Sequence, residues 1–521
     1  MTGRGARLDP VTLQVLAGSF RALCEEMGAV LVRSAHSANI KERRDASTGL
    51  FDAAGEMVMQ AEHIPVHLGA MPDAVAAVRE LEQRPGDAWI LNDPYRGGTH
   101  LPDITVVSPL FEGATLVAFA ASRAHHADVG GRTPGSMPAR STTLDEEGVV
   151  IGPTRIASGG RLDEELLDEL TSRMRGTGQR QADLRAQLAA NRLAGVRLAS
   201  LVERSGLELV RSGMDAVLDY AERRTRASIE RIPDGAYRAR DVLEAEGGGE
   251  LAIEATVTVK GQQVEVDFTG TDPQTGGNLN CPLSVTKSAV YYVLRVATDP
   301  DIPASAGAYR PVAVRAPAGC LVNARPPAAV AGGNVETSSR IADVVTLALG
   351  EALPMPAQGQ GTMNNLTLGN AAFEGGFTYY ETLGGGQGAC PDSDGPSAVH
   401  VAMSNTLNTP VEALEQEFPL RVLEHSLRRG TGGAGAQRGG DGLVRELEAR
   451  EPMEYSLLTE RRRIAPQGAA GGGPGARGRN LLRHANGELE ALPAKAQGRL
   501  AAGEALRIET PGGGGYGAPE G

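Results

Sequence analysis

Two apolar runs joined by a short turn constrain the fold of this chain more than any other feature. The first is ITVVSPLF (residues 104–111), the second is TLVAFAASRA (residues 115–124), and a Glu-Gly turn lies between them. Apolar runs of this length predict strands, and the short turn predicts an antiparallel hairpin. In such a hairpin the start of the first strand lies beside the end of the second. Residues just before 104 and just after 124 are therefore expected to meet at one end of a sheet.

Side chains of the kind that bind metals occupy these two positions. His100 and Asp103 precede the first strand, and His125 ends the second, followed by His126 and Asp128. Imidazole and carboxylate ligands suit Mn, Zn or Fe(II). HxxD and HH also occur by chance, and many loop histidines only form hydrogen bonds. The convergence at one end of the hairpin favours a divalent metal site over that structural alternative.

A second polar cluster lies in SANIKERRDAST (residues 37–48). Arg43 and Arg44 are able to bind an anion such as a phosphorylated substrate. Glu42 and Asp45 are carboxylates in the same segment, and Glu42 is a further candidate metal ligand. A solvated charged turn before a strand explains the same residues without a functional role, and the residue pattern alone favours that interpretation.

Two further histidines, His63 and His67, have H-x3-H spacing in AEHIPVHLGA. On a helix this spacing binds metals, but Pro65 lies between them and argues against a helix. We therefore expect both to be structural residues or outer partners of a metal site.

The glycine-rich segments predict no phosphate loop. There is no GxxxxGK[ST] motif, and GGGQG (residues 384–388) lacks a following Lys and Ser or Thr. GGNVETSSR (residues 332–340) and TMNNLTLG (residues 362–369) are compatible with a polar pocket wall or with capped turns. The runs at 468–478 and 511–517 are expected to form turns, the second of them in the C-terminal tail.

The remaining patterns predict an α+β fold, with a β-rich metal-site region, long helices and a glycine-rich β region at the C-terminal end. We expect two parts, residues 1–230 and 231–521. A β hairpin is predicted within 235–268. The predicted helices run from Asp9-Pro10 to about Ser34, from about 162 to 229 with a break at Ser205-Gly206, and over about 284–297 and 337–351.

Charge and composition exclude several classes of partner. The net charge is −13 and no basic block is present, which argues against nucleic acid and anionic membranes. No run of about 20 apolar residues is present to span a bilayer, and the first residues lack an apolar signal core. The four Cys are far apart and form no CxxC pair, which indicates reduced thiols. A cytoplasmic protein is expected.

The order of several motifs resembles the hydantoinase B family. This family includes the B subunit of ATP-dependent N-methylhydantoinase, the corresponding part of 5-oxoprolinase and the α subunit of acetone carboxylase. The resemblance extends along nearly the whole chain. The motifs are, in order, DPVTLQVLAGSF, SANIKERRDAS, HIPVHLGAMP, NDPYRGGTHLPD, AHHADVGG, GGNVETSSRI, ETLGGGQGA, MSNTLNTPVEALE and TPGGGGYG.

The resemblance implies a division of labour between two subunits. In this family an A-type subunit, or A region, carries the ATP site, in line with the missing phosphate loop here. Phosphorylation of a hydantoin or lactam by ATP would occur there, and the B-type chain would then complete ring opening at a divalent metal site. The expected assembly is a hetero-oligomer with an A-type subunit.

The resemblance also implies roles for individual residues. His100, Asp103 and His125 match the expected metal ligands, and Glu42 lies where a further carboxylate ligand is expected. The residues expected to act on the substrate or around the metal are Asp45, His126 and Asp128, with Asp45 accepting a proton and Arg43 or Arg44 holding a phosphate.

Two alternatives remain. An ATP-dependent ketone carboxylase subunit would have the same fold and metal but would use bicarbonate. The ordinary length of this chain favours the hydrolase, because the acetone carboxylase α subunit is typically longer. A non-catalytic scaffold is the other alternative, against which the intact His100, Asp103 and His125 argue.

Overall fold

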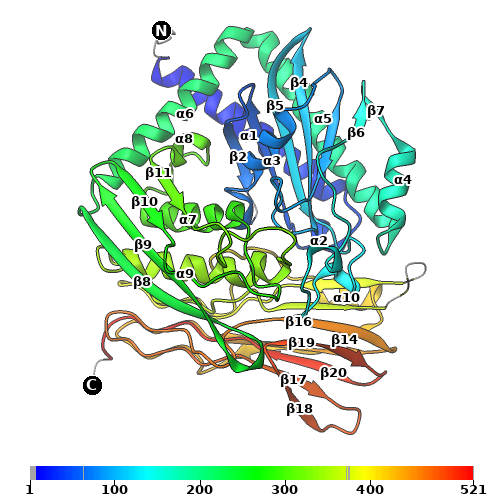
Figure 1. The fold of residues 1–521 in the computed structure, drawn as a ribbon, viewed down its shortest axis with the longest axis vertical. Helices are drawn as coiled ribbons and strands as arrows, with labels where there is room; N and C mark the ends of the chain where they lie inside the picture. The colour runs from blue at the N-terminus through cyan, green and yellow to red at the C-terminus, as the bar shows by residue number, and fades with distance from the viewer. Residues whose placement is uncertain (1–7, 63, 371, 373–375, 520–521) are drawn as a thin grey trace.

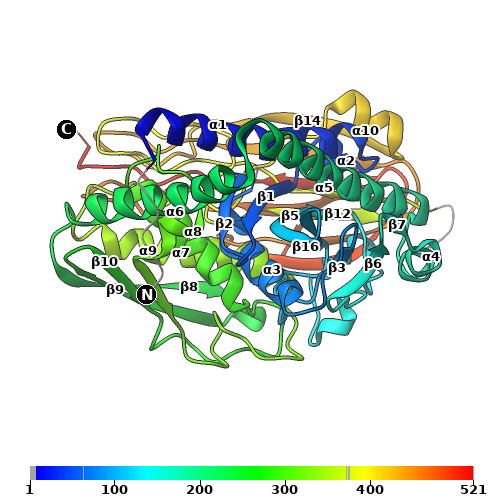
Figure 2. The same ribbon diagram turned by 90° about the horizontal axis from the view of Figure 1, so that it is seen from above.

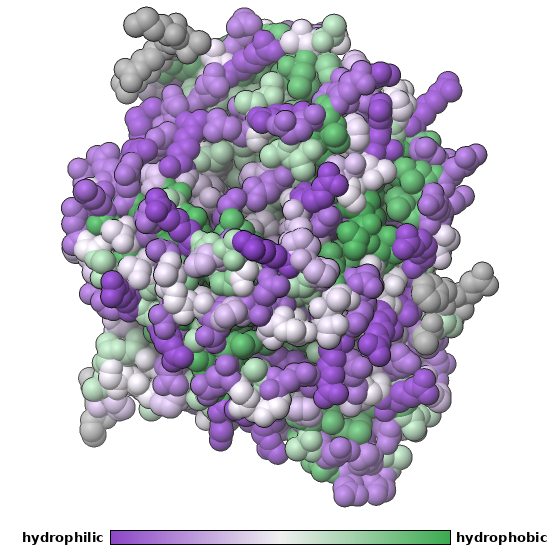
Figure 3. Space-filling view, in the orientation of Figure 1, coloured by the Kyte–Doolittle hydropathy of each residue, from purple (hydrophilic) through white to green (hydrophobic). Residues whose placement is uncertain are grey.

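The computed structural model describes residues 8–519, apart from residues 63, 371 and 373–375. The fold is α+β, as the sequence predicts, with four sheets among the described residues (Figure 1). Within these residues, no helix combines the length and the apolar character needed to cross a membrane. Hydrophilic residues cover most of the face seen in Figure 3.

The first sheet has seven strands in the order β2-β1-β5-β4-β3-β6-β7. Its central strands, β5 and β4, form the hairpin that the two apolar runs predict. The strands are β1 (Ala46–Asp52), β2 (Met57–Glu62), β3 (Ala88–Leu91), β4 (Asp103–Glu112), β5 (Thr115–His125), β6 (Thr154–Ser158) and β7 (Arg161–Leu162).

Long helices cover one face of this sheet, and the metal-site candidates lie on the other. α1, α5 and α6 pack on the face that carries the alanines of β5, such as Ala120 and Ala124 (Figures 1 and 2). α3 packs on the opposite face, against Phe119 and Ala121. The helices of this region are α1 (Pro10–Ser34), α2 (Ala38–Lys41), α3 (Met71–Arg79), α4 (Glu164–Ser172), α5 (Thr177–Ser205) and α6 (Leu207–Ile229).

The boundaries of these helices follow local chemistry. The Asp9 carboxylate accepts hydrogen bonds from the amides of Val11 and Thr12, both at 3.0 Å, and so caps α1. Gly206 ends α5 with a φ of 84°, a conformation that favours glycine. The predicted first helix and the predicted break near residue 206 are therefore confirmed.

The second sheet, in the order β11-β10-β9-β8, packs against α9 and lies beside α7. The predicted hairpin within 235–268 is β9 and β10. A π-helical turn, Gly333–Thr337, leads directly into α9. The elements are β8 (Gly235–Glu244), β9 (Glu250–Lys260), β10 (Gln263–Asp267), β11 (Val312–Arg315), α7 (Leu283–Ala297), α8 (Ala306–Tyr309) and α9 (Ser338–Leu349).

Two C-terminal sheets pack face to face through a shared core. Their strand orders are β13-β12-β16-β19 and β14-β15-β20-β17-β18. The elements are β12 (Asn365–Gly369), β13 (Thr378–Glu381), α10 (Val411–Glu417), β14 (Leu420–Arg428), β15 (Gly442–Ala449), β16 (Met453–Leu458), β17 (Arg479–Arg483), β18 (Leu489–Leu492), β19 (Lys495–Leu500) and β20 (Ala505–Glu509).

The predicted boundary at residue 230 falls between α6 and β8. One core cluster nevertheless joins Ile64, Val66 and Met137 with Ile253 and Val285 from beyond that point. The division into 1–230 and 231–521 stays a prediction.

The segment 511–517 is not the tail turn that its sequence predicts. Gly512–Gly515 are buried and form no turn, and they lie among three other glycine-rich segments. A Cβ atom added at any of the four would collide with a neighbouring backbone carbonyl oxygen. Successive amides donate to different neighbouring segments, and the first and the fourth donate to the same one, residues 468–478. The acceptors are the carbonyl oxygens of Ala476, Gly440, Gln358 and Gly473, in chain order.

Candidate metal centre

The hairpin of β4 and β5 brings the predicted metal ligands together. Asp103, the first residue of β4, lies directly opposite His125, the last residue of β5. His100 lies in the turn before β4, where its carbonyl oxygen accepts the Asp103 amide at 3.1 Å. One ligand atom from each of the three side chains lies within 4.8 Å of the other two.

The three side chains form a buried group with the chemistry of a divalent metal site. All three are at most 3% exposed. Nε2 of His100 and Nε2 of His125 have no hydrogen-bond partner among the described residues. Buried polar atoms normally have partners, so two such nitrogens beside a carboxylate fit a bound cation. The residues present therefore fit a divalent metal.

The ionisation states of Asp103 and His125 also suit metal binding. Burial raises the pKa of the Asp103 carboxyl, but the neighbouring His100, His67 and His125 outweigh burial and hold that pKa well below its usual range. Burial lowers the pKa of His125. An ionised carboxylate and a neutral imidazole are the forms in which these side chains bind metals.

Polar residues from two neighbouring segments outside the strands hold Asp103 in place. Thr99 Oγ1 donates to Asp103 Oδ2 at 2.6 Å. His67 Nε2 lies 3.4 Å from the same oxygen, and its Nδ1 lies 2.9 Å from Ser47 Oγ. His67 thus contacts the group from outside, and His63 lies outside the described residues.

Arg123 is a buried residue that sequence analysis missed. Its Nε donates to Thr105 Oγ1 at 2.7 Å, and its Nη2 donates to the Gly97 carbonyl at 2.8 Å. Burial lowers its pKa to about 10, and the Asp103 charge opposes that shift. The signal was present in the sequence, because Arg123 precedes His125 by two residues and therefore shares its strand face.

A tyrosine from the C-terminal half also reaches the group. The Tyr380 ring, on β13, stacks on His125 with 4.5 Å between ring centroids and 8° between planes. Its hydroxyl donates to Asn365 Oδ1 at 2.8 Å. Asn365 Nδ2 in turn donates to Glu336 Oε1 at 2.8 Å. Glu336 and Asn365 belong to the two polar segments considered as a pocket wall, whereas nothing in the local sequence indicated Tyr380.

The charged segment 37–48 is only partly a solvated turn. Arg44 is exposed, as that interpretation requires. Arg43 is fully buried, and its guanidinium donates to the Tyr380 carbonyl, Thr382 Oγ1 and Thr406 Oγ1 at 2.6–3.1 Å. For Arg43 and Asp45 the expectation of a solvated turn is wrong, because their contacts are with the interior.

Asp45 and Glu42 differ in their relation to the group. Asp45 is 4% exposed, and its carbonyl oxygen accepts the His125 amide at 3.0 Å. Its carboxylate opposes the lowering of the His125 pKa, so the two side chains are near each other. Glu42 is half-buried, and its charge adds to the effect of burial in raising the pKa of Glu417. The structure does not bring Glu42 into the His100–Asp103–His125 group.

His126 and Asp128 lie apart from the group. His126 follows His125 and therefore faces α5, where its Nε2 lies 3.0 Å from Gln187 Oε1. Burial lowers the pKa of His126 to about 4. Asp128 accepts hydrogen bonds from the amides of Gly130, Gly135 and Arg175 and from the Arg175 guanidinium. These contacts support the loop after β5, and the catalytic roles of both residues stay predictions.

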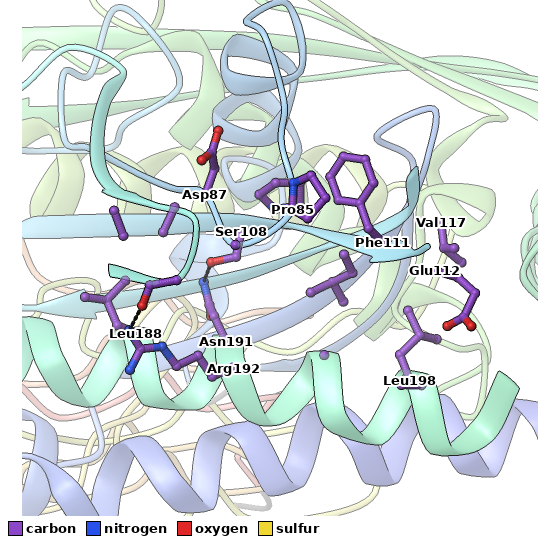
Figure 4. A pocket seen from close by; sticks show the side chains of 18 of the residues that line it. Pro85, Asp87, Ser108, Phe111, Glu112, Val117, Leu188, Asn191, Arg192 and Leu198 are labelled. Carbon is purple, nitrogen blue, oxygen red and sulfur yellow. Dashed lines mark hydrogen bonds between the residues drawn. The ribbon is translucent and has the colours of Figure 1, made fainter. Parts of the chain in front are cut away.

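A cavity of about 270 Å³ lies between α5 and the far end of the hairpin, near Ser108 and Glu112 (Figure 4). Asn191 crosses it to donate to Ser108 Oγ at 3.2 Å. Its lining includes none of the predicted metal ligands. This cavity is therefore separate from the metal group.

Glu336 makes a testable contribution to stability. Burial, reinforced by Glu460, raises its pKa to about 8, so the carboxyl is protonated in the folded protein at neutral pH. A folded-state pKa above the unfolded value gives stability that is complete at low pH and is lost as pH rises through about 8. Between about pH 5.5 and 7.5, the wild type should lose roughly 2–3 kcal/mol of unfolding free energy relative to Glu336→Gln. Urea unfolding of both proteins at the two pH values measures this difference.

The exposed Glu351→Gln change, just beyond α9, is the control and should follow the wild type. Parallel pH dependence of the wild type and Glu336→Gln would show that Glu336 ionises normally.

Comparison with known proteins places the chain in a family. A family model described as Hydantoinase B/oxoprolinase matches residues 9–519. 5-Oxoprolinase 1 of Arabidopsis thaliana is 40% identical over 536 residues, covering 98% of this chain and 42% of that protein. A protein of Pseudomonas sp., named as the B subunit of a D-/L-hydantoinase, is 31% identical over 537 residues, covering 98% of this chain and 90% of that protein. The chain thus spans less than half of the Arabidopsis relative.

Solved structures show the same fold. The ATP-dependent caprolactamase from Pseudomonas jessenii matches with a TM-score of 0.92 and 29% identity, over 98% of this chain and 92% of that chain. Nucleotide-free acetone carboxylase matches with a TM-score of 0.87 and 17% identity, over 98% and 76% of the two chains. The second likeness shows the fold alone. With a family match along nearly its whole length, the chain belongs to the Hydantoinase B/oxoprolinase family.

Proposed function

We propose that this chain is the metal-binding subunit of an ATP-dependent hydrolase of cyclic amides. In this proposal, a separate A-type subunit phosphorylates the ring with ATP, and this chain completes ring opening within a hetero-oligomer. The observation that carries the proposal is the buried group of His100, Asp103 and His125, whose Nε2 atoms have no hydrogen-bond partner among the described residues. The names of the relatives support cyclic amides as the substrate class and a partner subunit, because they are a 5-oxoprolinase, the B subunit of a hydantoinase and a caprolactamase.

In this proposal, different residues of the chain bind the metal and accept the proton. His100, Asp103 and His125 hold the cation, which when bound polarises an amide carbonyl and lowers the pKa of water. Asp45, buried next to His125, accepts a proton from the attacking water. The buried site keeps bulk water away from the activated ring.

In this proposal, Arg44 binds the phosphate of the activated substrate. All the hydrogen bonds of Arg43 described above are made to neutral groups of the C-terminal half. Arg44, two residues before the buried strand β1, is exposed and therefore free to reach a phosphate. The four cysteines form no disulfide with one another, which agrees with the cytoplasmic compartment that we propose.

The ketone carboxylase alternative gains no support beyond the shared fold, because the acetone carboxylase likeness is at 17% identity. A bicarbonate requirement distinguishes the two functions. The chain, co-expressed with an A-type subunit, should be assayed with ATP and a panel of hydantoins, 5-oxoproline and other lactams, with and without bicarbonate. Ring opening coupled to ATP hydrolysis and independent of bicarbonate is expected.

Metal removal completes this test. A chelator should abolish ring opening, and adding back Mn, Zn or Fe(II) separately should restore it and identify the metal. Strict dependence on bicarbonate with turnover of a ketone would move the chain to the carboxylase branch. Full activity in protein that holds no metal would overturn the assignment of the site.

A further inference from the structure

We infer that Tyr380 is a positioning residue that fixes the His125 ring in the metal group. The inference rests on the proposed function, because it requires that His125 binds a metal. It concerns a contact between two halves of the chain, the hairpin of the first sheet and strand β13 of a C-terminal sheet.

Among the described residues, His125 lacks the hydrogen bond that usually orients a metal-binding histidine. A metal-binding histidine is usually oriented by a hydrogen bond from its second ring nitrogen to a group outside the metal site. Nδ1 of His125 lies 3.4 Å from Asp103 Oδ1, a member of the metal group itself, and Nε2 has no partner among the described residues. No hydrogen bond from outside the group therefore sets the rotation of this ring within the part of the chain that the structure describes.

The stacked Tyr380 ring supplies that missing restraint. The planes of the two rings differ by only 8°, so the tyrosine limits both tilt and rotation of the imidazole. His100 approaches from another side, with 5.0 Å between ring centroids and planes tilted by 45°. His125 is thus confined by two rings and by Asp103.

Tyr380 is itself held at both ends. Its hydroxyl donates to Asn365 Oδ1, and Arg43 Nη1 donates to its carbonyl oxygen at 2.6 Å. The Arg43 guanidinium carbon also lies 5.0 Å from the centre of the tyrosine ring. Burial raises the pKa of Tyr380, which keeps the hydroxyl protonated and able to donate.

The hydrogen-bond partner of the Tyr380 hydroxyl is equally fixed. Asn365 Nδ2 donates to both Glu336 Oε1 and the Leu458 carbonyl, at 2.8 and 2.9 Å. These two contacts also orient the amide, because they leave Oδ1 facing the tyrosine. The restraint on His125 therefore continues into the π-helical turn before α9 and into strand β16.

The neighbouring Tyr379 provides a matched control. It lies on the same strand and is as buried as Tyr380, at 1% and 2% exposure. Its ring faces the other side of β13, where the centroids of the Tyr379 and Phe418 rings are 5.1 Å apart. A substitution at Tyr379 therefore removes a comparable buried ring without touching His125.

The experiment compares Mn(II) binding by the purified chain and its Tyr380→Leu, Tyr380→Phe, Asn365→Ala and Tyr379→Leu variants. Free and bound Mn(II) are measured by electron paramagnetic resonance, and Co(II) absorption spectra report the ligand geometry. Tyr380→Leu should weaken Mn(II) binding by about 10–100-fold and change the Co(II) spectrum. Tyr380→Phe, which keeps the stacked ring, and Asn365→Ala should have smaller effects, and Tyr379→Leu should bind as the wild type does.

The outcomes separate the two proposals. A wild-type chain without stoichiometric metal would overturn the proposed function and this inference with it. Stoichiometric metal in the wild type together with unchanged affinity and spectrum in Tyr380→Leu would overturn this inference alone. If Tyr380→Leu does not fold, Tyr380→Met, which also removes the ring, takes its place with Tyr379→Met as its control, and unchanged affinity and spectrum in Tyr380→Met would overturn the inference.

Discussion

Replacing Asp103 with Asn is expected to empty the metal centre and remove activity of the assembled enzyme. Of His100, Asp103 and His125, the three residues proposed to bind the cation, Asp103 alone is anionic, and it lies opposite His125 and 3.0 Å from His100 Nδ1. An amide of the same shape can still accept from Thr99, so the loop should keep its fold. Loss of a residue that contacts a metal ligand from outside typically lowers metal affinity or activity by about 10–100-fold. Loss of a ligand itself should therefore lower turnover by more than about 100-fold. Metal content and ring-opening rate measure both effects.

Asp87→Asn is the matched control for this change. Asp87 is buried to a similar extent, at 2% exposure, and precedes β3 in the same sheet. It pairs with Arg155, away from the metal group. This variant should keep its metal and its turnover. Full metal content and unchanged turnover in Asp103→Asn would show that the Asp103 carboxylate does not hold the metal.

Replacing Gly513 with Ala is expected to prevent stable folding of the C-terminal half. The added Cβ would meet the backbone carbonyl oxygen of Gln387, which cannot move as a side-chain end can. The Gly513 amide donates to Gly440 at 2.9 Å, and its carbonyl accepts from Gly433 at 2.8 Å, so the segment cannot shift without breaking these bonds. Overpacking against mobile side chains costs about 1–3 kcal/mol, and against fixed backbone we expect at least about 4 kcal/mol.

Gly276→Ala is the control for Gly513→Ala. Nothing lies within 4 Å of a Cβ added at Gly276, and its φ is not positive. This change should alter the free energy of unfolding by less than about 1 kcal/mol. Denaturant unfolding of the two variants measures the difference. A Gly513→Ala protein as stable as Gly276→Ala would show that the glycine-rich segments have room for side chains.

Local patterns were sufficient to predict the hairpin and the helices. The convergence of His100, Asp103 and His125 follows from a hairpin register, since residues equally distant from one turn must meet at one end of a strand pair. α1 follows from a cap at Asp9 and from helical spacing of its buried residues. Each of these predictions depends on residues that are close together in the sequence.

Three features could not be predicted in this way, and each depends on distant contacts. Tyr380 reaches His125 only because β13 folds back onto the first sheet. Arg43 and Asp45 looked solvated because charges in a turn usually face water, whereas partners from residues 380–406 bury Arg43. Gly512–Gly515 resembled a turn because glycine usually marks one, whereas here the absence of side chains allows backbones to pack together.

The separation of Tyr380 from the hairpin also sets an order of events during synthesis. The predicted metal ligands His100, Asp103 and His125 leave the ribosome about 250 residues before Tyr380, which at about 5–20 residues per second corresponds to roughly 13–50 s. During that interval the C-terminal half cannot yet cover His125, so the ligands face solvent and ions can reach them freely. Once β13 has docked, the same ligands are nearly sealed. If the proposed function holds, the time between these two events is when a nascent chain can most easily bind the metal.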